Sequence, residues 1–523
     1  MRSWTSLTTL LALTGCSGTD LRYSDEAHAG IDTGAPPTNE DAGGSESDDN
    51  APPESENAFL ALVPAQTDVY VFVANPERNT VTRVKVDDRS VRTLEVGEDP
   101  RIVLTTPDYS TAVVFNRGDD SVSILDADTL EQRVVRVRDN MNQLAISPDG
   151  RFAALWHDLD AERPDDPTPS GVQSYNEVSF VDLSTGIHYG MAVDYNPREI
   201  KFNAAGTLAA VVTDTSLGLV DLRTFPLLPT LVPVTDELLD PPVAEEVEVS
   251  PNGDYAFVRQ FGATDLAVVD LSLREVYRLP CGTNPTDLDI TPDGAHAIVV
   301  ARGSRELWSY AVADPFADPD VLPIPSTVGL GSVLIDPTGQ QAILYTTATP
   351  TDRYATWDLN TGVIQERALV KPIKSIAVTP TGDSLLVFHT KTNATEGDAS
   401  SPFYNSWALT TISLPDFRQN PLKLPAEPIG FDTSNNGRLG YFIMEGEPLL
   451  EVLDFQTLLP EEIELDSEPV YVGVLPDLTF GDSNEPFAWV SQKHVLGRMT
   501  FYDPDDGSVE TITGFELNSQ IED

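Results

Sequence analysis

The side-chain chemistry that the sequence offers most plainly is cation binding by carboxylates. Five acids follow one predicted strand closely: Asp158, Asp160, Glu162, Asp165 and Asp166. A second acidic group at 503–507 lacks the spaced bidentate glutamate of an EF-hand loop. Because Ca²⁺ needs about six to eight oxygen ligands, solvated turn residues are the simpler interpretation of the first group. Binding of Ca²⁺ there is the alternative.

Nucleophilic and acid–base chemistry finds little support. The histidines outside the N-terminal region are dispersed: His157, His188, His296, His389 and His494. The sequence has no nucleophile elbow, no glycine-rich phosphate loop and no HExxH motif. We therefore predict no catalytic residue and no cofactor, and the sequence favours a binding protein over an enzyme.

The N-terminus carries a thiol in a setting suited to acylation. Arg2 precedes a short apolar run that ends in Leu13-Thr14-Gly15-Cys16, as in a secretory signal. This ending resembles the lipobox of bacterial lipoproteins. The resemblance implies that residues 1–15 are a signal peptide and that Cys16 becomes the diacylglyceryl-modified, acylated first residue. Several acyl chains together anchor a protein stably. The residue after the cysteine is Ser17 and not the aspartate that in enterobacteria resembles an inner-membrane retention signal, which favours the outer membrane. An ordinary secretory signal is the alternative interpretation of the N-terminus.

Residues 16–57 have the composition of a tether. After Cys16 they are rich in Asp, Glu, Gly, Ser, Pro and Thr, and they contain a single base, Arg22. Such a segment has too little apolar surface to offset its ordering entropy, so we predict a disordered linker. The other cysteine, Cys281, lies among apolar and turn residues and is expected to be a buried thiol without a disulfide.

The elements that position all of these residues come from one repeated unit. Each unit has four short alternating segments, and a turn such as Ser147-Pro148-Asp149-Gly150 separates the first two. Units begin near residues 57, 99, 139, 195, 243, 283, 328, 371, 426 and 469. Four strands in a period of about 40 to 55 residues predict a β-propeller over 58–523. One large ring is favoured, and two five-bladed rings remain possible.

The repeats also resemble a known family. The segment 70–97 contains Tyr-Val-Phe-Val-Ala-Asn and Asn-Thr-Val, and Asp182-Leu183-Ser184-Thr185-Gly186 follows a third strand. These resemble the YVTN-type repeats of surface-layer and secreted WD40-like propellers. The resemblance implies that the first strand of each unit lines the central channel and the fourth lies outermost. It also extends, at the level of the repeat, to lactonase propellers.

Two long connections between second and third strands stand out, at 157–173 and 389–405. The resemblance places both on the face that also carries the connections between units. Long loops on a rigid scaffold are common binding sites. Residues just before the first strands are expected to rim the channel on that face and to form the candidate ligand face: Arg101, Asn142, Gln143, Arg198, Glu199, Asp287, Lys374 and Tyr471. The bases among them indicate an anionic ligand or simple local charge balance.

The overall charge limits the classes of possible binding partner. The chain has 83 acids and 32 bases, a formal net charge of −51, which repels nucleic acid and anionic lipid. We expect a monomeric, lipid-anchored protein of the bacterial cell envelope whose acidic propeller binds an envelope protein, a peptide or a polysaccharide. It would contact the membrane through its anchor only. The alternatives are a secreted propeller enzyme acting on a lactone or sugar, and a calcium-stabilised wall component.

Overall fold

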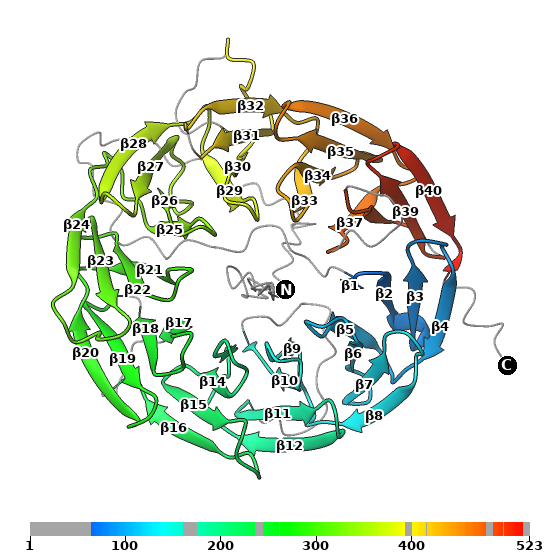
Figure 1. Ribbon diagram of the computed structural model, residues 1–523, viewed down its shortest axis with the longest axis horizontal. Helices are drawn as coiled ribbons and strands as arrows, with labels where there is room; N and C mark the ends of the chain where they lie inside the picture. Colours follow the sequence, from blue (N-terminus) through cyan, green and yellow to red (C-terminus); the bar gives the residue numbers. More distant parts are fainter. Residues whose placement is uncertain are drawn as a thin grey trace, which may run out of the picture.

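The computed structural model describes residues 64–159, 175–235, 244–260, 262–392, 400–414, 416–476, 485–494 and 496–515. Their strands form ten four-stranded antiparallel sheets, arranged as the blades of one ring around a central channel (Figure 1). The predicted all-β propeller of ten units is therefore confirmed. The alternative of two five-bladed rings is wrong, because all ten blades belong to a single circle.

Each blade consists of four consecutive strands, ordered from the channel outward. The innermost strands are β1 (Ala65–Gln66), β5 (Pro100–Thr105), β9 (Gln143–Ile146), β13 (Glu199–Phe202), β17 (Ala244–Val249), β21 (Pro285–Ile290), β25 (Ser332–Ile335), β29 (Ile373–Val378), β33 (Pro428–Thr433) and β37 (Pro469–Val474). The second strands are β2 (Tyr70–Asn75), β6 (Thr111–Asn116), β10 (Phe152–Trp156), β14 (Leu208–Val212), β18 (Tyr255–Gln260), β22 (His296–Ala301), β26 (Gln341–Tyr345), β30 (Ser384–His389), β34 (Leu439–Met444) and β38 (Ala488–Gln492).

The outer half of each blade follows the same order. The third strands are β3 (Thr80–Lys85), β7 (Ser121–Asp126), β11 (Glu177–Asp182), β15 (Ser216–Asp221), β19 (Asp265–Asp270), β23 (Glu306–Ala311), β27 (Arg353–Asp358), β31 (Ala408–Ser413), β35 (Leu449–Asp454) and β39 (Arg498–Asp503). The outermost strands are β4 (Val91–Glu95), β8 (Gln132–Arg136), β12 (Ile187–Ala192), β16 (Pro229–Pro233), β20 (Glu275–Pro280), β24 (Asp320–Pro323), β28 (Val363–Ala368), β32 (Gln419–Lys423), β36 (Leu459–Glu464) and β40 (Ser508–Thr513). One short 3₁₀ helix, η1 (Pro76–Arg78), connects β2 to β3.

The repeated turns act as local structural devices. In blade 3, the Ser147 hydroxyl accepts a 2.9 Å bond from the backbone N–H of Phe152 and donates a 2.6 Å bond to Asp149. Gly150 follows with φ of 70°, a left-handed conformation that glycine adopts without steric cost. The Ser/Thr-Pro-Asp-Gly pattern therefore sets the tight connection between first and second strands.

The hydrophobic core lies between blades rather than within them. Ten clusters of buried apolar side chains occupy the ten interfaces between neighbouring blades. The interface of the last and first blades contains Val71, Val84, Trp489 and Phe501. Because every sheet uses consecutive strands, the ring closes through this side-chain packing and not through a shared blade.

The antiparallel order of each blade divides the connections between two faces. One face carries the connections between second and third strands and the connections between blades, and we call it the loop face. We call the opposite face the turn face. Across the loop face, the side-chain amide of Asn142 donates to the carbonyl of Asp158 at 2.8 Å. The unit-to-unit connection thus meets the inserted connection after β10, as expected. Within the described ranges, no helix is long and apolar enough to cross a membrane.

Candidate ligand-binding site on the loop face

Several residues expected to rim the channel are engaged in joining the blades. Asp287 on β21 is fully buried, and its carboxylate accepts hydrogen bonds from the backbone N–H groups of Leu288, at 2.8 Å, and of Val333 in the next blade. Asp432 on β33 accepts equivalent bonds from Thr433, at 2.7 Å, and from Val474 in the next blade, at 2.8 Å. Such carboxylates pair backbone groups at the inner strands that would otherwise lack partners.

The surroundings of the half-buried Asp432 also affect its protonation. Burial raises the pKa of its carboxyl to about 6, against the opposing effect of the two backbone hydrogen bonds. At Asp287 and Asp432, the innermost strands of neighbouring blades are joined by bonds from a backbone N–H to a side-chain carboxylate. Inside a blade, by contrast, strands are joined by direct backbone ladder bonds.

Glu199 belongs to a charged group of the same kind. Lys201 Nζ lies 3.1 Å from Glu199 Oε1 and 3.1 Å from Glu248 Oε1 of the next blade. Burial alone would lower the pKa of Lys201, but the charges of Glu248 and Glu199 raise it above its ordinary value. This triad ties blade 4 to blade 5. Arg198, just before β13, lies 4.0 Å from Asp214 and accepts a bond at its carbonyl from Trp156 Nε1.

The remaining rim residues lie on the loop side of the inner strands. Arg101 sits at the β-bulge between Pro100 and Ile102, and its Nε lies 2.7 Å from the Asp99 carboxylate. Asn142 holds the base of the blade 3 connection, whereas Gln143 on β9 is buried. Tyr471 on β37 is half-buried and packs against the cluster that closes the ring.

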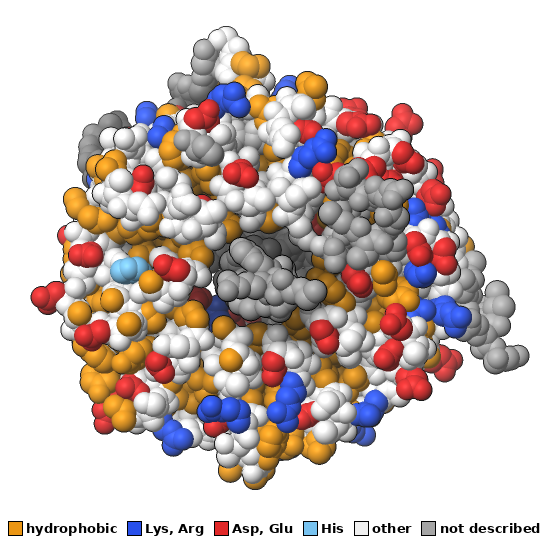
Figure 2. All heavy atoms as spheres, in the orientation of Figure 1, with side chains coloured by type: hydrophobic (Ala, Val, Ile, Leu, Met, Phe, Trp, Pro, Cys, Tyr) orange, Lys and Arg blue, Asp and Glu red, His pale blue; other side chains and the backbone are white. Residues whose placement is uncertain are grey.

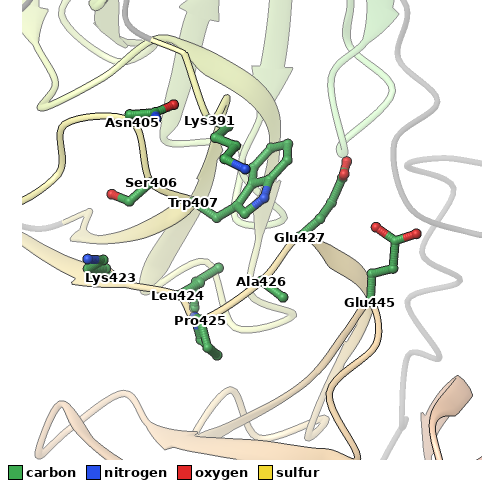
Figure 3. Close-up of a pocket in the computed structure, with 10 residues that line it drawn as sticks. All are labelled: Lys391, Asn405, Ser406, Trp407, Lys423, Leu424, Pro425, Ala426, Glu427 and Glu445. Atoms are coloured by element: carbon green, nitrogen blue, oxygen red, sulfur yellow. The ribbon is translucent and has the colours of Figure 1, made fainter.

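Lys374 lies beside a pocket on the loop face. It lies at the β29 bulge, pairs with Glu427, and its Nζ stands 5.1 Å from the centroid of the Trp407 ring. Trp407 and Glu427 line a cavity of about 360 Å³ between blades 8 and 9 (Figure 3). Its other lining residues are Lys391, Asn405, Ser406, Lys423, Leu424, Pro425, Ala426 and Glu445.

The lining has a defined chemical arrangement. Figure 3 shows Lys391 beside the Trp407 ring, Lys423 on the side away from the two glutamates, and Glu427 and Glu445 on the opposite side. The apolar segment 424–426 lies beside Trp407. The walls come from three connections: the inserted one after β30, the link from β32 to β33, and the start of the connection after β34.

A buried cation fixes the inserted wall. The ammonium of Lys371, whose side chain is 2% exposed, donates to the carbonyl oxygens of Lys391 at 2.7 Å, Phe403 at 3.0 Å and Ser406 at 2.6 Å. Burial lowers the pKa of this lysine. Because Lys391 and Ser406 lie at opposite ends of the insertion, one ammonium clamps the base of the loop.

Of the residues in and around this pocket, Lys374 was expected from the sequence as part of a ligand face, whereas Lys371, Lys391, Trp407 and Lys423 were not. A signal for them was present in the composition. The whole chain has seven lysines, and four of them fall between residues 371 and 423. In a protein with 83 acids, such a concentration distinguishes this segment from the rest of the chain.

The two histidines at the ends of second strands, His157 just after β10 and His389 as the last residue of β30, have structural roles. His389 is fully buried, with Nε2 2.7 Å from the Thr410 hydroxyl and Nδ1 3.1 Å from the Pro372 carbonyl. Burial lowers its pKa to about 4, so the ring is neutral at physiological pH. His157 contacts the Asn140 carbonyl at 2.7 Å and packs on Tyr175 with ring centroids 5.1 Å apart.

The acidic candidates for Ca²⁺ are only partly described. Asp158 is buried, and its backbone N–H donates to the Asn142 side chain at 2.8 Å. Asp160, Glu162, Asp165 and Asp166 lie outside the described residues. Among the parts of the chain that the structure describes, no group of three or more His, Cys, Asp or Glu side chains has an arrangement suited to a metal ion.

On the face seen in Figure 2, acidic and basic side chains are interspersed around the ring. The high net negative charge is therefore distributed over many blades. Against this background, the lysines around the blade 8 pocket form a distinct local environment.

Comparisons with known proteins show the fold. A scan against models of protein families finds no match, and neither does a comparison with curated protein sequences. Among solved structures, a eukaryotic initiation factor matches with a TM-score of 0.50 and 13% identity, over 86% of this chain and 97% of that one. Dihydro-heme d1 dehydrogenase NirN matches with a TM-score of 0.45 and 16% identity, over 70% and 75%.

A third match is the β-propeller domain of Cps50 (Swd1) from Myceliophteria thermophila, with a TM-score of 0.34 and 18% identity, over 57% of this chain and 94% of that one. At these identities the likeness is one of architecture. The match with a TM-score of 0.50 bears on the fold alone, and the strand order of the ten blades is what shows the β-propeller.

Proposed function

We propose that this chain is a lipid-anchored protein of the bacterial cell envelope that presents its propeller as a platform for binding a protein or glycan ligand. The pocket between blades 8 and 9 carries the binding part of the proposal. It has an aromatic wall, charged groups of both signs and a loop fixed at its base by Lys371. Concave sites with a few well-placed polar groups are the usual form of small-ligand sites.

The location is supported by the N-terminal sequence. The segment Leu13-Thr14-Gly15-Cys16 resembles a lipobox, and Ser17 favours sorting to the outer membrane. The acidic residues 17–57 then separate the propeller from the membrane surface. With a formal net charge of −51, the protein is repelled by anionic headgroups, so the anchor supplies the attachment.

The binding part is tested by crosslinking in native cells followed by mass spectrometry. In a loop variant, residues 390–407 are replaced by the short connection 117–120 of blade 2. We expect crosslinks to an envelope protein or glycan in the parent chain and their loss in this variant. As a matched control, the connection 475–487 on the turn face is shortened by a comparable length; this change should leave the crosslinks in place. Crosslinks that survive in the loop variant would contradict the proposal.

The anchor is tested by Cys16→Ser. We expect metabolic labelling with palmitate to disappear and the protein to leave the membrane fraction. Cys281→Ser is the control and should change neither result, because Cys281 is buried in the interface of blades 5 and 6. Palmitate labelling that persists in Cys16→Ser would show that the lipobox interpretation is wrong.

A further inference from the structure

The lysines around the blade 8 pocket distinguish it from the rest of the protein. Lys391 and Lys423 line the pocket, Lys374 stands over the Trp407 ring, and Lys371 lies behind the wall. These are four of the seven lysines of the chain. The other described lysines, Lys85, Lys201 and Lys493, are all paired with carboxylates.

The charges that face the pocket are not all matched. Lys374 is paired with Glu427. Lys391 and Lys423 are exposed, and no described carboxylate forms an ion pair with either ammonium. Glu445 is exposed on the opposite side of the pocket. An anion entering beside Lys391 and Lys423 would therefore meet two available ammonium groups.

The overall charge restricts the size of that anion. A formal net charge of −51 disfavours a large polyanion, which would extend over acidic neighbouring blades. At physiological ionic strength charges are screened over about 8 Å. A small anion bound within the pocket is therefore governed by the charged groups that line it, Lys391, Lys423, Glu427 and Glu445, and not by distant acids. A cavity of about 360 Å³ accommodates such a ligand.

The uncharged residues of the lining indicate which other chemical groups a ligand of this pocket would carry. Trp407, Leu424, Pro425 and Ala426 offer apolar surfaces, while Asn405 and Ser406 offer amide and hydroxyl groups. A sugar ring has C–H faces that pack on an indole or a proline ring. Its hydroxyl groups also exchange hydrogen bonds with amides, hydroxyls and carboxylates. A carboxylate on the ring would meet the ammonium groups.

Resting on the proposed binding function, we propose that the blade 8 pocket binds a carboxylate-bearing sugar, such as a uronic acid residue at the end of an acidic glycan. Lys391 and Lys423 bind the carboxylate, Trp407 packs against the ring, and Asn405 and Glu445 bind ring hydroxyls. Lys371 acts as a positioning residue, because it fixes the carbonyls of Lys391 and Ser406 before the ligand arrives.

The test is titration calorimetry of the full chain in detergent with glucuronate and galacturonate. Glucose and galactose are the neutral counterparts, and benzoate and acetate are the anions without a sugar ring. Uronates should bind at least about tenfold more tightly than the neutral sugars, which is the range of one charge-assisted hydrogen bond. Their affinity should fall with added NaCl.

Two variants and one control locate the site. Lys391→Gln and Lys423→Gln should each weaken uronate binding by about tenfold. Lys493→Gln, on a lysine that pairs with Glu468 at 2.7 Å, should leave it unchanged. All three exchange a surface lysine, so equal melting temperatures would show that the fold is retained.

Three results would overturn the inference: no uronate binding by the parent chain, affinity for neutral sugars equal to that for uronates, or uronate affinity of the two lysine variants equal to that of the parent chain. Tighter binding of benzoate than of uronates would also overturn it, in favour of an aromatic anion. The proposed platform function stands separately. It survives these outcomes if the crosslinks to an envelope ligand still depend on residues 390–407.

Discussion

The indole Nε1 of Trp489 donates a 2.7 Å hydrogen bond to Oε1 of Gln66, which joins the tenth blade to the first. The same glutamine donates from Nε2 to the carbonyl of Val474 at 2.7 Å. One side chain thus uses both ends of its amide across the seam, 423 residues from the indole in sequence. Since no strand is exchanged at the closure, these bonds supplement the apolar packing there.

We expect Gln66→Ala to weaken the seam. It removes two hydrogen bonds and leaves the indole N–H of Trp489 without its partner in an enclosed site, which costs about 1–3 kcal/mol of unfolding free energy. Chemical denaturation followed by tryptophan fluorescence measures the loss. Gln365→Ala, at an exposed position of outermost strand β28, is the control. Equal stability of the two variants would show that apolar packing alone closes the ring.

Cys281 is expected to be unreactive in the folded protein. Its side chain is fully buried, and burial raises the pKa of the thiol to about 12, so almost no thiolate exists at pH 8. In a Cys16→Ser background, a chromogenic disulfide reagent should titrate no thiol in buffer and one thiol in concentrated guanidinium.

A second variant provides the matched control for this thiol assay. Thr361→Cys adds a cysteine at an exposed turn, and one thiol should then react rapidly in buffer. Rapid reaction of Cys281 itself in the folded state would show that the interface of blades 5 and 6 opens on the timescale of the assay.

Much of the fold follows from local patterns in the sequence. Alternation and Pro-Asp-Gly turns specify single strands and hairpins, so the unit expected to begin near residue 99 appears as a four-stranded blade whose middle hairpin is β6 (Thr111–Asn116) and β7 (Ser121–Asp126). The number of rings depends instead on contacts between distant parts of the chain. The bond between Gln66 and Trp489 has no local signature that would distinguish one ring from two.

The candidate site was harder to predict from the sequence, because it also depends on contacts between distant parts of the chain. Lys374 was expected just before a first strand; it lies within β29, at the bulge, and beside the pocket. Asp287 occupies a related place, yet its carboxylate is taken up by backbone groups of two blades. Which polar residue faces a ligand and which one joins blades depends on the neighbouring blade. The pocket itself requires three connections to converge. The sequence indicated one of them, the long connection 389–405, and the concentration of lysines was a second signal.

Glu451 should make stability depend on pH. This residue of β35 is 5% exposed, and burial together with the charge of Glu462 raises the pKa of its carboxyl to about 7. A carboxyl with a raised folded-state pKa binds more protons when folded than when unfolded. Its contribution is therefore fully present below pH 4.5 and is lost as the pH rises to about 7.

Glu451→Gln should remove this dependence. The variant is expected to gain about 1–3 kcal/mol relative to the parent at pH 8, and little at pH 4. Urea denaturation at several pH values measures the difference. Glu464→Gln, on an exposed residue of β36, controls for the loss of one negative charge. Parallel pH profiles for parent and Glu451→Gln would contradict the assignment.

Lys371→Met tests whether a single ammonium holds the loop that carries the pocket wall. The substitution keeps an unbranched side chain of similar length but leaves the carbonyls of Lys391, Phe403 and Ser406 without their donor. Unpaired buried carbonyls are costly, so the base of the loop should open more often. We expect amide hydrogen exchange in residues 400–407 to increase by about tenfold, equivalent to about 1.4 kcal/mol of local stability.

The matched control for the loop is Lys423→Met, which removes an exposed lysine of the same pocket. It should leave exchange in 400–407 unchanged, because the Lys423 ammonium makes no such contacts with the described part of the loop. Amides of β30, which pair with β29 and β31, should stay protected in both variants, since blade packing holds them. Faster exchange in β30 of Lys371→Met would show that the lysine stabilises the whole blade. Unchanged exchange in 400–407 would show that the loop is held by other contacts.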